Sequence, residues 1–180
     1  MATTTTPITV DEFLKLPEND QQRIELIDGE IVELPSPGYI HERTKANLTS
    51  ILVVWLFQHP IGKVFVETAY RLEEHWAPIP DLSVLRNERL VPGTRGLIEG
   101  APDLAIDVVS SETADYLLAK IQAYRKHGSK AVWAVFPERR AIQIYTASPR
   151  NAILDESQTL EDHDVLPGFS APVAAIFEGL

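Results

Sequence analysis

The sequence contains no cysteine. Disulfide bonds and metal sites built on thiolates are therefore both excluded, and the absence fits a reducing compartment, so a cytoplasmic location is predicted. No apolar run is long enough to span a bilayer, the longest being residues 51–57, and no membrane association is expected. The five histidines are scattered without an H-x-x-x-H spacing, which argues against a histidine zinc site.

Several catalytic signatures are also missing. The chain has no G-x-S-x-G, no P-loop and no G-x-G-x-x-G, and Ser110 and Ser111 have no histidine near them in the sequence to activate a serine nucleophile. Basic residues are in the minority, since 16 Lys and Arg stand against 26 Asp and Glu for a net charge of −10. Non-specific nucleic-acid binding depends on Lys and Arg neutralising phosphates, so this balance disfavours a long duplex footprint.

The 180 residues, 44% of them hydrophobic, are enough for one domain with a sizeable core. We expect a frayed tail over residues 1–8 and a single domain over residues 9–180. The pattern indicates an α/β or α+β domain with a mixed central β-sheet flanked by helices. In chain order it predicts a helix over 10–16 with Thr9 and Glu12 as a capping box, a hairpin over 23–34 turning at Asp28-Gly29, a helix over 39–59, strands over 62–72 and 79–85, a loop over 86–100, a central strand over 104–109, a helix over 113–127, a hairpin of strands 131–136 and 141–146, and a last short helix after residue 166.

Two aspartates stand inside segments that otherwise predict buried strands. Asp107 lies in the apolar run 104–109, which is typical of a strand covered on both faces, and Asp81 lies in 79–85. Asp107 could simply cap a backbone amide near the strand end, and Asp81 could start a turn after Pro80. A buried carboxylate is costly, however, unless it is paired or holds a metal. If the two strands are neighbours, the pair can bind one Mg²⁺ or Mn²⁺ together with phosphate oxygens.

Lys120 is predicted to lean over the same sheet. On the helix over 113–127, Leu117, Ile121 and Tyr124 form the inward stripe, and Lys120 lies about 60° from its centre. Lys126 should face solvent. Lys120 could instead only extend its stem over apolar surface. Beside the two aspartates it predicts a catalytic site for phosphate chemistry, in which the ammonium orients the attacking water or stabilises the pentacovalent phosphate.

Other polar residues are weaker candidates. Glu67 could add a third acidic metal ligand, or it could pair with Arg71 on the same face of its strand. Glu25 could reach the site from its position before the Asp28-Gly29 turn, but the favoured prediction is an exposed strand residue. His41 is predicted to be a surface or first-turn histidine. Three arginines of the 86–100 loop could hold nucleic acid or solvate the loop; these are Arg86, Arg89 and Arg95.

Six segments in a fixed order resemble the Uma-two family of restriction-endonuclease-like proteins, part of the PD-(D/E)XK nuclease superfamily. The likeness runs from about residue 10 to residue 146, and the L-P-G-F of the tail also fits. The segments are E-L-I-D-G-E-I-V (25–32), G-Y-I-H (38–41), V-F-V-E (64–67), P-D-L-S-V-L (80–85), E-G-A-P-D-L-A-I-D-V-V-S (99–110) and K-I-Q-A-Y-R-K-H-G (120–128).

This resemblance implies a restriction endonuclease-like core, metal-dependent phosphodiesterase chemistry and a homodimer. It places Asp81 at the aspartate of the P-D element and Asp107 at the second acidic position, which is usually glutamate in relatives. It also implies that Lys120 replaces the standard motif lysine, at whose position Val109 stands. Glu67 matches a glutamate on the preceding strand. The chain departs from the family at Tyr116, where relatives commonly carry an aspartate.

The leading prediction is a metal-dependent endonuclease that acts on DNA. Asp81 and Asp107 would bind the metal, Glu67 would assist, and Lys120 would position the attacking water. Two alternatives stay open. The acidic charge and Tyr116 favour a catalytically silent binding or scaffold protein on the same fold. A metal-dependent phosphohydrolase of small substrates is less affected by the acidic charge than a duplex-binding enzyme.

Overall fold

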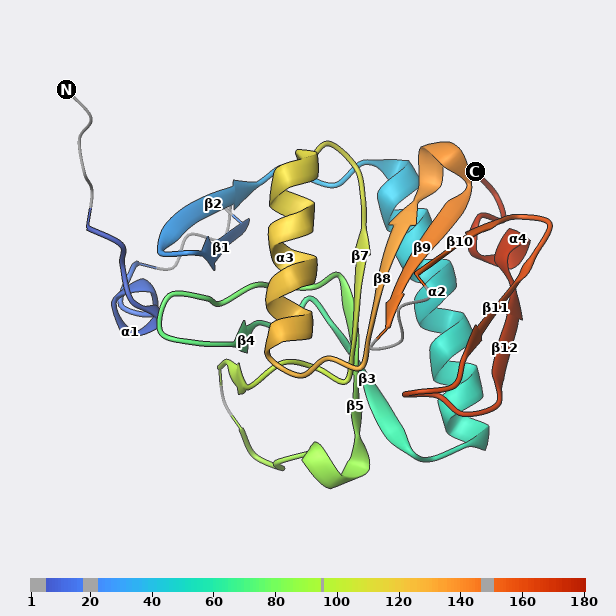
Figure 1. Ribbon diagram of the computed structural model, residues 1–180, viewed down its shortest axis with the longest axis horizontal. Helices are drawn as coiled ribbons and strands as arrows, with labels where there is room; N and C mark the ends of the chain where they lie inside the picture. Colours follow the sequence, from blue (N-terminus) through green and yellow to red (C-terminus); the bar gives the residue numbers. More distant parts are fainter. Residues whose placement is uncertain (1–5, 18–22, 95, 147–150) are drawn as a thin grey trace.

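A six-stranded mixed sheet forms the centre of the computed structural model, which describes residues 6–17, 23–94, 96–146 and 151–180 (Figure 1). The strand order is β10-β9-β8-β7-β5-β3. Strands β7 and β8 pair in parallel, and the other neighbours pair antiparallel. The predicted fold class is confirmed. The strands are β3 (Gly62–Val66), β5 (Leu82–Arg86), β7 (Leu104–Val108), β8 (Ala131–Phe136), β9 (Ala141–Thr146) and β10 (Ala152–Asp155).

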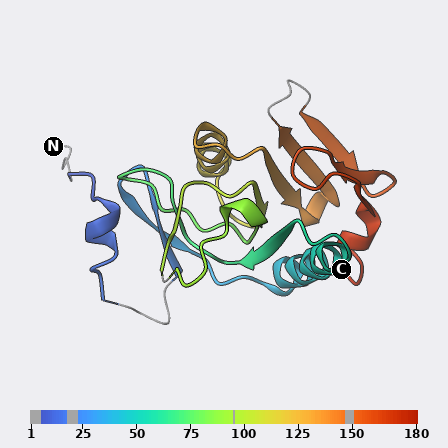
Figure 2. The same cartoon turned by 90° about the horizontal axis from the view of Figure 1, so that it is seen from below.

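Two helices cover opposite faces of this sheet, α2 (Tyr39–Gln58) on one side and α3 (Ala114–Lys126) on the other (Figures 1 and 2). The α2 side packs Leu48 and Leu52 against Ile106, whereas the α3 side packs Ile121 against Ala105. Because successive strand residues point to opposite faces, β7 is buried on both sides, as its apolar sequence predicts. Every second residue of β7, including Asp107, therefore faces α3.

Helix α3 connects the parallel strands β7 and β8. The Thr113 side chain caps its first turn by accepting from the Tyr116 amide, and Gly128, with φ +104°, follows its end. Both boundaries agree with the predicted helix. The capped start and the apolar stripe of Leu117 and Ile121 against the sheet fix the rotation of α3, and with it the direction of Lys120.

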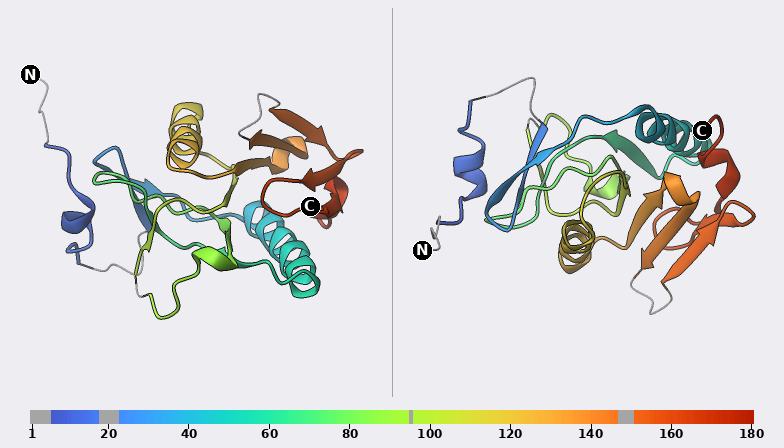
Figure 3. Two further views of the ribbon diagram at one scale, coloured as in Figure 1. Left: turned by 60° about the horizontal axis from the view of Figure 1, so that its bottom comes forward. Right: turned by 90° about the horizontal axis from the view of Figure 1, so that it is seen from above.

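The N-terminal part forms a separate layer beside the sheet (Figure 3). Helix α1 (Val10–Phe13) has the predicted capping box, and strands β1 (Arg23–Ile27) and β2 (Glu30–Leu34) form the predicted hairpin. Asp28 and Gly29 both have positive φ, 52° and 77°, as a two-residue hairpin turn requires. The frayed tail was predicted for residues 1–8, of which residues 1–5 lie outside the described residues. Within the described part, the Ile8 amide donates to the Gly29 carbonyl.

The predicted strand over 62–72 is wrong in its length. Glu67 adopts the left-handed region, φ 46°, and divides the segment into β3 and β4 (Tyr70–Arg71). Strand β4 pairs in parallel with β6 (Ile98–Glu99), which lies inside the predicted loop over 86–100 together with the short helix η1 (Asn87–Arg89). The chain therefore leaves the central sheet at Glu67 and rejoins it after Asp81, where β5 begins.

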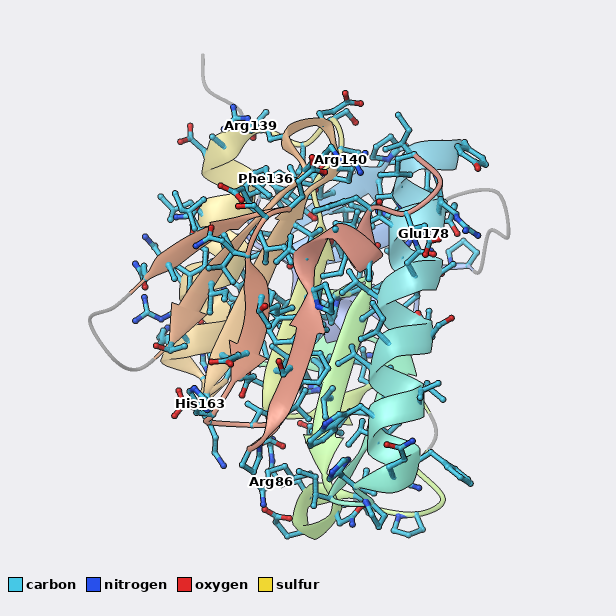
Figure 4. The ribbon with its side chains drawn as sticks, turned by 90° about the vertical axis from the view of Figure 1, so that its right-hand side faces the viewer. Arg86, Phe136, Arg139, Arg140, His163 and Glu178 are labelled. Atoms are coloured by element: carbon cyan, nitrogen blue, oxygen red, sulfur yellow. The ribbon has the colours of Figure 1, made fainter. Side chains whose placement is uncertain are left out.

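The C-terminal part was only partly predicted. The short helix η2 (Pro137–Arg139) connects β8 and β9. After β9 the chain forms β10 and then a hairpin of β11 (Thr159–Asp162) and β12 (Phe169–Pro172). Of the helix predicted after residue 166, Val173–Ile176 form α4, whereas Phe169–Pro172 pair as β12. Figure 4 shows this hairpin and α4 lying across the sheet next to α2, where Phe169 and Ile176 join the α2 core. None of the helices in the described ranges has the length and apolarity needed to cross a membrane.

Candidate active site

Asp107 lies in β7, and Asp81, predicted inside the strand over 79–85, immediately precedes the adjacent antiparallel strand β5. The register pairs Leu82 with Ile106 and Ser83 with Ala105, so its continuation by one residue places Asp81 opposite Asp107 on the face covered by α3. The Asp81 Oδ2 atom accepts a hydrogen bond of 2.7 Å from the Val108 amide. The two predicted strands are therefore neighbours. It is Asp81, not Asp107, that caps a backbone amide.

Lys120 reaches this pair from α3. Its Nζ atom lies 2.8 Å from Asp107 Oδ1 and 3.2 Å from Glu25 Oε1, and donates to the Ile79 carbonyl at 3.3 Å. The side chain is 6% exposed, so it does not extend into solvent, whereas Lys126 is 65% exposed, as predicted. Burial lowers the pKa of Lys120, but the charges of Asp107 and Glu25 more than offset it, and the pKa stays well above its ordinary value. Lys120 is a permanent cation in the site.

Glu25 is the acidic residue whose place in the site the favoured sequence interpretation rejected. It is fully buried, and the prediction of an exposed strand residue is wrong. Its Oε2 atom accepts from the Ile79 amide at 2.8 Å, and its Oε1 atom accepts from the Tyr116 hydroxyl and from Lys120. The alternation in β1 correctly puts Glu25 on a polar face, but that face packs against α3 instead of water. Tyr116, the departure from the family pattern, is the residue that binds Glu25.

His41 also belongs to the site. It lies in the first turn of α2, as predicted, but it is buried and not on the surface. Its Nε2 atom lies 3.2 Å from Asp81 Oδ1, and its Nδ1 atom lies 3.2 Å from Glu42 Oε1. Ionised carboxylates only accept hydrogen bonds, so His41 can donate to both Asp81 and Glu42 only when both of its ring nitrogens carry protons. Burial lowers the pKa of His41, but the bonds to Asp81 and Glu42 raise it above its ordinary value.

Asp107 has one oxygen without a partner. Its Oδ2 atom is buried and has no hydrogen-bond donor within the part of the chain that the structure describes. Burial raises the pKa of Asp107 to about 7, Lys120 opposes this rise, and the neighbouring charge of Asp81 adds to it. For Asp81, burial is the largest influence and raises the pKa, but the bond and charge of His41, the Val108 amide and the charge of Lys120 together hold the pKa below its ordinary value. The pair thus combines an ionised carboxylate with one that needs a proton or a cation.

The donor set fits a hard divalent cation. Carboxylate oxygens are the protein ligands that Mg²⁺ prefers, and the free Asp107 Oδ2 is directed away from Lys120, which bonds the other oxygen. Among residues 6–17, 23–94, 96–146 and 151–180, no group of three His, Asp or Glu is arranged as a metal site. An ion here would depend on two carboxylates, and on water and substrate oxygens for the rest.

Glu67 is placed differently from the prediction. Its carboxylate pairs with Lys45 at 2.7 Å and Arg23 at 2.8 Å. It does not line the cavity beside Asp81 and Asp107, which we call the acid pair. Arg71, its predicted alternative partner, pairs instead with Asp11 and Glu99. The structure brings the Glu67 backbone to the site, since its amide donates to the Asp81 carbonyl.

The loop arginines have structural partners. Arg86 pairs with Glu88, and Arg89 donates to the Ala101 carbonyl and lies 3.4 Å from Asp103. Arg95 lies outside the described residues. The two described side chains hold the loop to the domain, and neither lines the cavity at the acid pair.

The cavity itself is small, about 50 Å³. This is room for a cation and a few waters, and not for a nucleoside. The side chains that bear on the chemistry, all on its wall, are Glu25, His41, Asp81, Asp107, Tyr116 and Lys120.

Comparison with known proteins gives a family and a similar solved structure. Residues 10–174 match the model of the family described as "Uma2: Putative restriction endonuclease". The crystal structure of "a putative nuclease belonging to DUF820 from Anabaena variabilis" superposes with a TM-score of 0.84 at 25% identity, covering 95% of this chain and 98% of that one. No curated protein matches the chain. Both matches support a nuclease, and the chain belongs to the Uma2 family of restriction endonuclease-like proteins.

Proposed function

We propose that this protein is a metal-dependent endonuclease that hydrolyses phosphodiester bonds in DNA. The observation that carries the proposal is the unpartnered Asp107 Oδ2, buried opposite Asp81 and next to the Lys120 ammonium. A structural ion pair would use both oxygens of a buried carboxylate, because each unsatisfied oxygen costs free energy. Here one oxygen is left for a ligand.

Asp81 and Asp107 would hold Mg²⁺ or Mn²⁺. When bound, such an ion polarises the phosphate, lowers the pKa of the attacking water and neutralises developing charge. His41 fixes Asp81 through Oδ1, and the Val108 amide fixes it through Oδ2, so this carboxylate cannot rotate freely. The chain thereby sets one ligand rigidly and leaves the other, Asp107, with a free oxygen.

Lys120 supplies the positive charge that the phosphate needs. Its three contacts, to Asp107, Glu25 and the Ile79 carbonyl, hold the ammonium in place before substrate arrives. A fixed cation stabilises the charge that develops on the phosphate oxygens without reorganising first. Glu25 and Tyr116 are positioning residues in this scheme, because Glu25 bonds Lys120 and Tyr116 bonds Glu25.

The test is cleavage of plasmid and oligonucleotide DNA with Mg²⁺ or Mn²⁺. We expect EDTA to abolish cutting, and Asp107→Asn to reduce it by about 100-fold or more, as loss of a metal ligand does. Asp164→Asn, an exposed aspartate far from the cavity, is the matched control. Circular dichroism checks that both variants fold. Cutting that persists in Asp107→Asn would remove Asp107 from the mechanism.

A homodimer, which the family resemblance implies, is part of the same proposal. Sedimentation velocity measures it directly, and a single monomer boundary at every protein concentration would rule it out.

A further inference from the structure

A second hollow lies next to the cavity of the acid pair. It measures about 560 Å³ and lies between α3 and the face of strands β8 and β9; we call it the α3–β9 groove. The pairing of Ala134 with Gln143 and of Val132 with Tyr145 turns these two β9 side chains to the same face as α3. The side chains that matter here are Leu118, Phe136, Arg139, Gln143 and Tyr145. Figure 4 shows Phe136 and Arg139 close together at the end of the sheet.

The groove and the cavity share a wall. Ser110 and Glu112 line both. The Glu112 Oε2 atom accepts from the Ser110 amide at 2.7 Å and from the Ser110 hydroxyl at 3.2 Å. These two bonds stabilise the turn, which forms a ridge between the cavity and the groove. The cavity, at about 50 Å³, cannot admit a nucleoside. A phosphodiester that reaches the acid pair must therefore leave its sugar and base outside, and the groove is the space immediately beyond the ridge.

The lining of the groove suits a nucleobase. Phe136 and Tyr145 are aromatic, and the Arg139 guanidinium lies 5.8 Å from the centre of the Phe136 ring. Leu118 is 47% exposed at the rim. Among the described residues, neither the Gln143 amide nor the Tyr145 hydroxyl has a hydrogen-bond partner. Aromatic faces stack on any base, and a free amide bonds its polar edge.

The charged residues around the groove favour single-stranded over duplex DNA. Its charged residues are Glu112, Glu138 and Arg139, so it offers no cationic track for a run of phosphates. The net charge of −10 points the same way for the whole molecule. A base inside a duplex could enter only by flipping out, which costs a few kcal/mol, whereas a base in a single strand is already free.

From these observations we propose that the α3–β9 groove binds an unpaired base next to the scissile phosphodiester, and that the substrate class is single-stranded DNA. The inference rests on the proposed nuclease function, because it uses the acid pair as the place of the phosphate.

The first test is binding by fluorescence anisotropy, in the Asp107→Asn background with Mg²⁺. The probe is a fluorescein-labelled oligothymidylate, free or annealed to its complement. We expect tighter binding of the free strand. Tyr145→Leu should weaken that binding by about 5-fold or more, the loss of one base–aromatic stack, with little change for the duplex. Tyr145→Phe keeps the ring and should retain binding, which separates stacking from a loss of fold.

Phe57→Leu is the matched control, since Phe57 is an 88% exposed aromatic residue on α2 that lines neither hollow. It should leave the affinity for the free strand unchanged. Equal binding of free strand and duplex, or equal affinities for Tyr145→Leu and its parent, would overturn the inference.

Cleavage by the otherwise wild-type protein separates this inference from the proposed function. If the single strand is cut and Tyr145→Leu raises KM by about 5-fold with kcat retained, the groove holds the base. If duplex is cut at least as well and Tyr145→Leu cuts normally, the nuclease stands and the groove assignment fails. If no DNA is cut with either metal, the nuclease proposal fails, and the anisotropy measurement alone then decides whether the groove binds an unpaired base.

Discussion

Charge balance decides the behaviour of single residues in the site. Two buried carboxylates, Glu25 and Asp107, and the partly exposed Asp81 face the Lys120 ammonium and the His41 ring. Removing one member of such a cluster leaves another charge buried and unpaired, which is more costly than never having buried the pair. Substitutions here should therefore be as isosteric as possible, so that effects on chemistry are not confused with unfolding.

Asp107 should make the stability of the protein depend on pH. Burial raises its pKa from 3.8 to about 7, so between these values the folded protein holds a proton that the unfolded chain has released. Stability contributed by this group is complete below pH 3.8 and is lost as pH rises through 7. We expect Asp107→Asn to gain stability relative to wild type as pH rises, by at most about 1.4 kcal/mol per pH unit.

Urea denaturation in EDTA at a series of pH values measures this difference. Asp164→Asn, exposed and distant, should track wild type across the range. A stability difference between Asp107→Asn and wild type that does not change with pH would show that the Asp107 pKa is not raised.

Tyr116 should stabilise the fold through its hydroxyl. Tyr116→Phe removes the donor to Glu25, a fully buried carboxylate, and we expect a loss of about 1–3 kcal/mol in the free energy of unfolding. Tyr39→Phe is the control, because the Tyr39 hydroxyl bonds the Gly179 carbonyl from a side chain that is 71% exposed. That change should cost less than about 0.5 kcal/mol. Equal losses in the two variants, compared by urea denaturation, would contradict the role given to Tyr116.

Among the elements, the β1–β2 hairpin is the one that carries Glu25 to the cluster. Its turn is tied to the N-terminal segment, since the Ile8 amide bonds the Gly29 carbonyl and the Gly29 amide bonds the His75 carbonyl. A Cβ on Gly29 would lie 2.4 Å from the Pro7 Cβ, closer than any real contact. The hairpin therefore has little freedom to adjust at this point.

Gly29→Ala should destabilise the protein more than Gly168→Ala does. Both glycines have positive φ, +77° and +88°, so the backbone strain is similar, but a Cβ on Gly168 meets nothing within 4 Å. We expect a further loss of about 1 kcal/mol or more for Gly29→Ala, from overpacking against Pro7. Thermal melting of the two variants gives the comparison, and equal losses would mean that Pro7 does not pack on the turn.

The elements with strong local patterns could be predicted from the sequence. The capping box at Thr9, the Asp28-Gly29 turn and the apolar run around Asp107 each act over a few residues, and each is where it was expected. Lys120 was placed correctly because its helix has a clear inward stripe. The break at Glu67 was missed, since a left-handed glutamate inside an alternating run leaves no local trace.

Residues whose role depends on distant packing were the ones misplaced. Glu25 lies on the polar face of a hairpin, and only the docking of that face against α3 shows that it is buried. His41 begins a helix, and only the position of α2 relative to β5 shows that it meets Asp81. The α3–β9 groove is lined by residues of α3, the turn before it, β8, η2 and β9. No spacing in the sequence predicts that these residues meet.

At the scale of the whole molecule, a bound cation should stabilise the entire fold. An ion that binds only the folded protein adds about 2.7 kcal/mol when its concentration is 100 times Kd. We therefore expect Mg²⁺ or Mn²⁺ to raise the melting temperature, EDTA to reverse this, and Asp107→Asn to abolish it. Asp164→Asn should respond like wild type in the same differential scanning calorimetry. If neither Mg²⁺ nor Mn²⁺ changes the melting temperature of the wild-type protein, the result would argue against the cation site, whatever the cleavage assay shows.

The bond from the Val108 amide to Asp81 Oδ2 joins the ligand of one strand to the backbone of the next. The nuclear magnetic resonance signal of this amide proton therefore senses the electron density on the carboxylate directly. Its exchange with deuterium also reports how often the sheet opens at this end. One resonance can thus report both cation binding at the acid pair and local opening of the sheet in solution, without a fluorescent label or a substrate.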